Sequence, residues 1–93
     1  MRKSHELLLK LYFDPRYDFS LVSIDYIDRG APQDTSTVRG KQIARLDSQY
    51  MEVESERGIT CIPYHRILSI RYSGETLWDR YTAGEKKGQG SPE

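Results

Sequence analysis

Arginines that stand beside proline, glycine and histidine are the side chains of this sequence best suited to bind an anion. They occur in three stretches: DPR at residues 14–16, YIDRGAP at 26–32 and IPYHRI at 62–67. In each stretch a proline stiffens the backbone close to the charged side chain. A guanidinium can hold a phosphate through two parallel hydrogen bonds, and an imidazole can add a further donor. The pattern therefore predicts a phosphate-binding site built from loop ends.

The predicted site gathers side chains from separate parts of the chain. The arginines and the histidine would hold the phosphate, a tyrosine would offer a stacking surface for a base, and two aspartates would support the arginines. The predicted ligand-binding residues are Arg16, Arg29, Tyr64, His65, Arg66 and Arg80, and the supporting residues are Asp14 and Asp28. The alternative interpretation is that acids such as Asp14, Asp28 and Asp79 form ordinary surface ion pairs with these arginines, which contribute little to stability.

An enzyme that opens or forms a cyclic phosphate is a second hypothesis, with His65 as general acid and base. A mechanism with two histidines would require His5 at the same site, and neither histidine has a serine or threonine two positions later. A mechanism with one histidine would need a carboxylate, for which Glu75 and Asp28 are candidates. Binding without catalysis is the preferred interpretation. No cofactor or metal is expected, because the chain has one cysteine and its acids lack ligand spacing.

The same stretches resemble a small archaeal family of unknown function whose domain also occurs in eukaryotic multidomain proteins. The similarity covers roughly residues 4–81 and includes Gly74-Glu75, Trp78 and Arg80. It implies recognition of RNA ends, particularly those with a 2′,3′-cyclic phosphate, in RNA processing or repair. It also implies RNA-processing enzymes as partners. A protein-interaction adaptor, in which the arginines meet an acidic partner, is a further alternative.

Composition narrows these possibilities. The 93 residues contain 14 basic and 14 acidic side chains, so the formal net charge is zero. This balance argues against a protein that coats nucleic acid by bulk charge, but it allows a local pocket. With one cysteine no intramolecular disulfide can form, and no apolar run approaches the length of a membrane span. We expect a cytoplasmic protein, or a nuclear one in a eukaryote.

Apolar periodicity predicts the elements that must position these residues. A helix capped by Ser4 should run to about Tyr12, with Leu7, Leu8 and Leu11 on one face. The polar composition of the segment from Arg29 to Val38 predicts a mobile loop. Ser73-Gly74 predicts a hairpin turn. Cys61 is expected to be a small core residue. The predicted strands are residues 21–27, 43–47, 50–55, 59–62, 68–72 and 76–81.

The predicted fold class is α+β, with one N-terminal helix against a curved antiparallel sheet of five or six short strands. A small, partly closed β-barrel is the alternative. Residues 1–82 should form a single domain, and residues 83–93 a disordered tail rich in glycine. A weak internal repeat, here called the internal echo, is also present. Val38 is as far from Ile62 in the sequence as Ile43 is from Ile67. Shared β patterning explains this echo as well as a duplication does.

Overall fold

The computed structural model describes residues 2–81, which form one α-helix, seven β-strands and four short 3₁₀ turns. The helix α1 (Lys3–Phe13) precedes all of the strands. The strands are β1 (Val22–Ile27), β2 (Thr35–Arg39), β3 (Ile43–Leu46), β4 (Tyr50–Ser55), β5 (Gly58–Pro63), β6 (Ile67–Tyr72) and β7 (Glu75–Asp79). The 3₁₀ turns are η1 (Phe19–Leu21), η2 (Pro32–Asp34), η3 (Gly40–Gln42) and η4 (Tyr64–Arg66).

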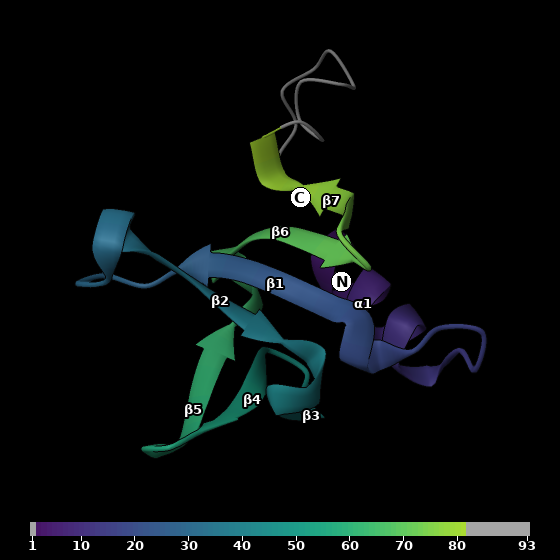
Figure 1. Cartoon of the computed structure of the whole chain (residues 1–93), viewed down its shortest axis with the longest axis horizontal. Helices are drawn as coiled ribbons and strands as arrows, with labels where there is room; N and C mark the ends of the chain where they lie inside the picture. Colours follow the sequence, from purple (N-terminus) through teal and green to yellow (C-terminus); the bar gives the residue numbers. More distant parts are fainter. Residues whose placement is uncertain (1, 82–93) are drawn as a thin grey trace.

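The strands form two antiparallel sheets, with the orders β2-β1-β6-β7 and β3-β4-β5 (Figure 1). The predicted α+β class is therefore confirmed. The barrel alternative is wrong, because both sheets stay open and each edge strand is paired on one side only. The predicted number of strands was also too low. Two short sheets replace the single curved sheet that we expected.

The missing strand is β2, which lies in the segment predicted to be a mobile loop. Its residues apart from Val38 are polar, and only Val38 is buried, so the sequence lacks the apolar alternation of a typical strand. Side-chain hydrogen bonds to β1 and to the residue that follows it compensate for this. Thr37 donates to Asp25 over 2.6 Å, and Ser36 donates to Asp28 over 2.6 Å. An edge strand can thus be held by cross-strand polar pairs, which hydrophobic periodicity does not reveal.

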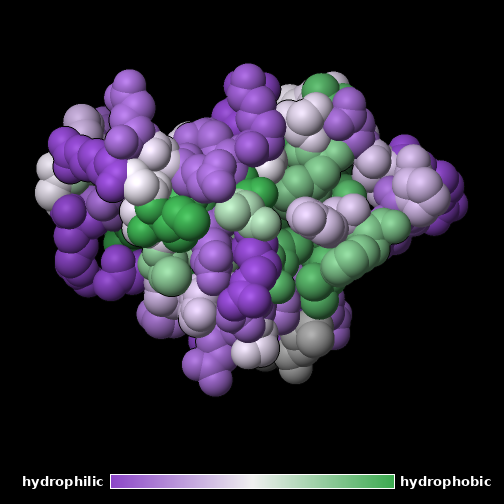
Figure 2. Space-filling view, turned by 90° about the horizontal axis from the view of Figure 1, so that it is seen from below, coloured by the Kyte–Doolittle hydropathy of each residue, from purple (hydrophilic) through white to green (hydrophobic). Residues whose placement is uncertain are grey.

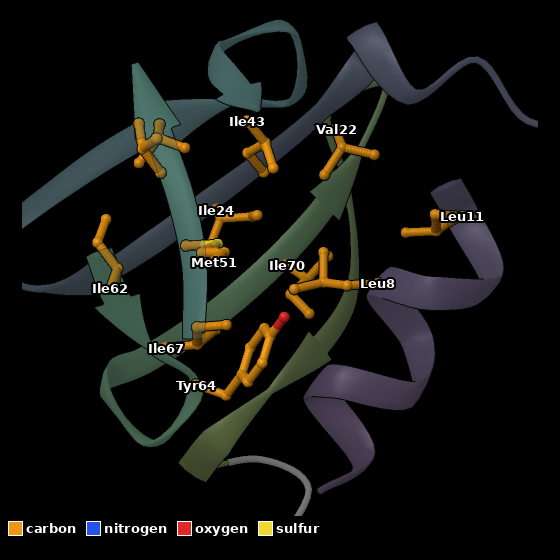
Figure 3. Packing of buried hydrophobic residues seen from close by; sticks show 12 residues of the cluster. Leu8, Leu11, Val22, Ile24, Ile43, Met51, Ile62, Tyr64, Ile67 and Ile70 are labelled. Atoms are coloured by element: carbon orange, nitrogen blue, oxygen red, sulfur yellow. The ribbon is translucent and has the colours of Figure 1, made fainter. Parts of the chain in front are cut away.

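The helix packs through the face that its leucine spacing predicts. Leu8 and Leu11 are buried in the core and Leu7 is partly buried against it. The predicted cap is wrong: Ser4 is buried inside the helix, and Arg2 occupies the cap position, where its side chain makes no capping hydrogen bond. Figure 3 shows the helix leucines facing strand residues such as Ile24 and Ile70.

Cys61 is exposed, so its predicted place in the core is also wrong. It alternates along β5 with Ile62, which is buried, and the period of two directs neighbouring side chains to opposite faces. Ser73-Gly74 forms the predicted turn between β6 and β7. Both residues have positive φ, as a tight hairpin turn requires.

The internal echo extends to the order of the elements. The series β2-η3-β3-β4 is followed by β5-η4-β6-β7, and η4 follows η3 at the same spacing that relates the apolar pairs. Val38 and Ile62 are both buried, as are Ile43 and Ile67. A strand, a 3₁₀ turn and a hairpin therefore occur twice in the same order.

Figure 2 shows a mostly hydrophilic surface with a larger hydrophobic area in the right half of the view and a smaller one to the left. The exposed large hydrophobic residues are Tyr12, Phe13, Leu21, Ile59, Leu77 and Tyr81. Within residues 2–81, no helix is long and apolar enough to cross a membrane. The tail predicted at residues 83–93 lies outside the described part of the chain.

Candidate functional site

The turn η4 sends three consecutive side chains in three directions. A 3₁₀ turn has three residues per turn, so successive side chains are about 120° apart. Tyr64 enters the core and is 2% exposed (Figure 3). His65 lines a cleft on one side, and Arg66 lines a pocket between the two sheets. The two predicted phosphate ligands His65 and Arg66 therefore face different hollows.

The cleft beside His65, here called the histidine cleft, has a volume of about 660 Å³. It contains both histidines of the chain, His5 from α1 and His65 from η4. Arg2 lines it from the cap position at the start of α1. The first turn of a helix carries partial positive charge, so an anion is favoured there. The other lining residues are Ser48, Gln49, Tyr50, Pro63 and Tyr64.

The imidazole of His5 stacks on the ring of Tyr64, with ring centroids 4.1 Å apart and planes inclined by 15°. His5 is only 6% exposed, and this burial is the main reason why its pKa lies below the ordinary value. The ring is consequently uncharged at neutral pH and can donate a hydrogen bond from only one nitrogen. The predicted stacking of Tyr64 on a base stays a prediction, but its ring already contacts His5.

The hydroxyl of Tyr64 donates to the carbonyl oxygen of Asp47 over 2.7 Å, and its amide donates to the carbonyl of Gln49 over 3.3 Å. These bonds attach η4 to the turn between β3 and β4. Burial, followed by the charge of Asp47, raises the pKa of Tyr64 to about 12. The phenol therefore keeps its proton. One buried tyrosine, Tyr64, therefore holds together two walls of the histidine cleft. One wall is the turn with Ser48 and Gln49, and the other is the turn with His65.

Arg80 supports the same wall from outside. Its Nε donates to the carbonyl of Ile67 over 3.2 Å, and its guanidinium also donates to the carbonyl of His65. The structure thus gives Arg80 a positioning role, since it fixes the backbone that carries His65. A direct contact with phosphate stays a prediction.

A second hollow, here called the inter-sheet pocket, has a volume of about 290 Å³. It lies between the end of β1, β2, η3, β4, β5 and η4. Arg66 and Asp28, both predicted from the sequence, line it together with Gln42. The structure therefore brings two of the predicted residues together, but in a different hollow from His65.

The remaining predicted residues lie apart from both hollows. Arg16 is exposed and forms an ion pair with Asp14 at 2.7 Å; hydrogen bonds from Arg16 lower the pKa of Asp14 to about 2. Arg29 is exposed in the loop after β1. Figure 1 shows that this loop and the loop after α1 project from opposite ends of the molecule. The structure does not bring Arg16 and Arg29 together, and a ligand role for either stays a prediction.

Sequence comparison agrees with the resemblance described above. Residues 1–80 match the family described as the MJ1316 RNA cyclic group end recognition domain. The chain belongs to this family. A UPF0248 protein of Archaeoglobus fulgidus is 39% identical over 71 residues, which are 76% of this chain and 96% of that protein. UPF0248 proteins of Methanococcus maripaludis are 38% and 36% identical over 77 residues, which are 81% of this chain and 95% of theirs. No solved structure matches the chain.

Most residues of the histidine cleft in this MJ1316 domain were not predicted as ligand candidates from the sequence. Arg2 precedes the helix, and Ser48 and Gln49 are uncharged residues of a turn without proline. His5 entered the hypotheses only as a possible partner of His65. The one available signal was that the chain has two histidines, and the fold places both in one cleft.

Proposed function

We propose that this MJ1316 domain binds RNA ends that carry a 2′,3′-cyclic phosphate, and that the histidine cleft receives the terminal nucleotide. The observation that carries the proposal is the convergence of Arg2, His5 and His65 on one cleft at the start of α1. The description of the family supports the class of ligand.

The volume of the cleft suits a nucleotide. Ligand sites of small molecules usually span about 300–1,000 Å³, and the histidine cleft measures about 660 Å³. A cyclic phosphate, a ribose and a base would fit together. The inter-sheet pocket, at about 290 Å³, has room for only part of a nucleotide.

The charges of the cleft suit a single negative charge better than two. A cyclic phosphate diester is a monoanion, whereas a terminal phosphate monoester carries up to two charges at neutral pH. Arg2 offers a permanent positive charge, and burial keeps His5 neutral at that pH. We therefore expect a preference for the cyclic end over the open 3′-phosphate.

The direct test is a titration with one short RNA prepared with three different ends: cyclic phosphate, 3′-phosphate and free hydroxyls. The proposal predicts the tightest binding for the cyclic end. Replacement of His65 by Gln should weaken that binding about tenfold, the effect of losing one hydrogen bond to a charged group. Arg57→Gln, in the exposed turn between β4 and β5, is the matched control and should leave the affinity unchanged. Equal affinity for all three ends would contradict the proposal.

A second candidate function is hydrolysis of the cyclic phosphate, because both histidines line the same cleft. His5 would take a proton from water as the water oxygen bonds to phosphorus, and His65 would give a proton to the ribose oxygen as its bond to phosphorus breaks. Incubation of the protein with uridine 2′,3′-cyclic phosphate tests this candidate. Formation of uridine monophosphate that is lost in both His5→Phe and His65→Gln would support it, and no turnover would reject it.

A further inference from the structure

The inter-sheet pocket has a feature that the histidine cleft lacks: its walls come from equivalent positions of the two repeated units. Three pairs of lining residues are related by the spacing of the internal echo, namely Thr37 with Cys61, Val38 with Ile62, and Gln42 with Arg66. The unit β2-η3 therefore faces the unit β5-η4 across the pocket. Concave sites between packed units are common places for ligands.

The lining of the pocket combines an apolar floor with a polar rim. Val38, Val53 and Ile62 belong to the buried core and provide the floor. Asp28 and Arg66 place opposite charges at the rim. Flat aromatic rings with polar edges fit such a site, since their faces pack on the apolar floor and their edges find hydrogen-bond partners. Nucleobases have this character.

The charged groups favour guanine among the four bases. Asp28 accepts a hydrogen bond from Ser36 over 2.6 Å, and a carboxylate has room for further donors. Guanine presents N1–H and an N2 amino group side by side, which a carboxylate can accept together. Its O6 and N7 are the acceptors that arginine contacts most often in nucleic acids, and Arg66 can supply that donor.

The position of the pocket relates it to the histidine cleft. His65 and Arg66 are consecutive residues of η4, and each lines a different hollow. An RNA chain that crosses η4 could therefore place neighbouring nucleotides in the two hollows. The larger cleft has room for the terminal nucleotide, and the smaller pocket has room for a base.

We propose that the inter-sheet pocket binds the base of the nucleotide that precedes the RNA end, with a preference for guanine. This inference rests on the function proposed above. The domain would then recognise two nucleotides. It would recognise the terminal nucleotide by its cyclic phosphate and the preceding nucleotide by the edge of its base.

The test compares uridine 2′,3′-cyclic phosphate with four dinucleotides that end in the same group and carry G, A, C or U before it. The guanine dinucleotide should bind roughly tenfold or more tightly than the other three, as expected for a good bidentate contact. Asp28→Asn should abolish that preference and leave the affinity of the mononucleotide unchanged. Glu56→Gln, an exposed acid of the turn between β4 and β5, is the charge-matched control.

Ser36→Ala separates structural damage from loss of recognition. It removes the hydrogen bond to Asp28 but keeps the carboxylate, so the guanine preference should persist. If Ser36→Ala and Asp28→Asn lose the preference equally, Asp28 acts through the structure of β2 and the proposed contact is wrong.

Tight binding of the mononucleotide with no gain from a second nucleotide would overturn this inference alone. Equal binding of the guanine dinucleotide with cyclic and hydroxyl ends, with the guanine preference kept in both cases, would instead support the base pocket and contradict cyclic-end recognition.

Discussion

The ring of His5 lies nearly parallel to the ring of Tyr64, with centroids 4.1 Å apart, and this stack joins the first turn of α1 to η4. His5 and Tyr64 are 6% and 2% exposed, so the contact belongs to the core although both residues line the histidine cleft. His5 and Tyr64 therefore line the candidate site and also stabilise the fold.

The burial of His5 makes the stability of the fold depend on pH. Burial lowers the pKa of His5 in the folded state below its ordinary value near 6.5, so the unfolded chain binds a proton more readily. The stability contributed by neutral His5 is present above pH 6.5 and is lost as the pH falls through the lowered folded pKa. The midpoint of thermal unfolding should therefore fall between pH 7 and pH 5.

His5→Phe is the matched variant for this prediction, since it keeps an aromatic ring against Tyr64 but cannot titrate. Its unfolding midpoint should change less between pH 7 and pH 5 than that of the wild type. An equal slope in both proteins would show that His5 does not cause the dependence.

The guanidinium of Arg80 donates to the backbone of η4, so Arg80→Met should affect both stability and binding. Loss of hydrogen bonds from a charged group should lower the free energy of unfolding by roughly 1–3 kcal/mol. The affinity for a cyclic-phosphate end should fall as well, because His65 loses its support. Chemical denaturation measures the first effect and RNA titration the second.

Arg57→Met serves as the control for that experiment. Arg57 is exposed, and its replacement should change the free energy of unfolding by less than about 0.5 kcal/mol. If Arg80→Met kept full affinity for RNA despite its lower stability, a positioning role of Arg80 for His65 would be excluded.

Gly40 sits where η3 meets η1, and the structure leaves no space for a side chain there. A Cβ atom at this position would lie 1.8 Å from the carbonyl oxygen of Phe19, which is backbone and cannot turn away. Gly40→Ala should therefore destabilise the protein by roughly 1–3 kcal/mol or more. At Gly30 a Cβ would meet no atom within 4 Å, and the cost there comes only from its positive φ of 98°.

Thermal unfolding of Gly40→Ala and Gly30→Ala compares the two costs. The Gly40 variant should have the lower midpoint. A Gly40→Ala protein as stable as the wild type would mean that η3 and η1 are free to move apart.

The sequence predicted the helix, most strands and the hairpin at Ser73-Gly74 because these elements follow apolar periodicity or turn chemistry. It missed β2, which is held by polar pairs such as Thr37 with Asp25. Pairing of β1 with β6 joins residues that are far apart in the chain, and nothing local in the sequence specifies it.

The candidate site was harder to predict for a related reason. We expected neighbouring residues such as His65 and Arg66 to act together, but a 3₁₀ turn directs them into separate hollows. The partners of His65 come from the start of α1 and from the turn before β4. Such a convergence is a property of the tertiary structure.

The central claim is that the RNA end occupies the histidine cleft, and mapping of backbone amide shifts by nuclear magnetic resonance tests it most directly. Titration with uridine 2′,3′-cyclic phosphate should shift the amides of residues 2–5, 48–50 and 64–65 most strongly. The amides of Asp14, Arg16 and residues 28–31, in the two loops at opposite ends of the molecule, should change little. Saturable shifts centred on those loops, or no saturable shifts at all, would contradict the claim.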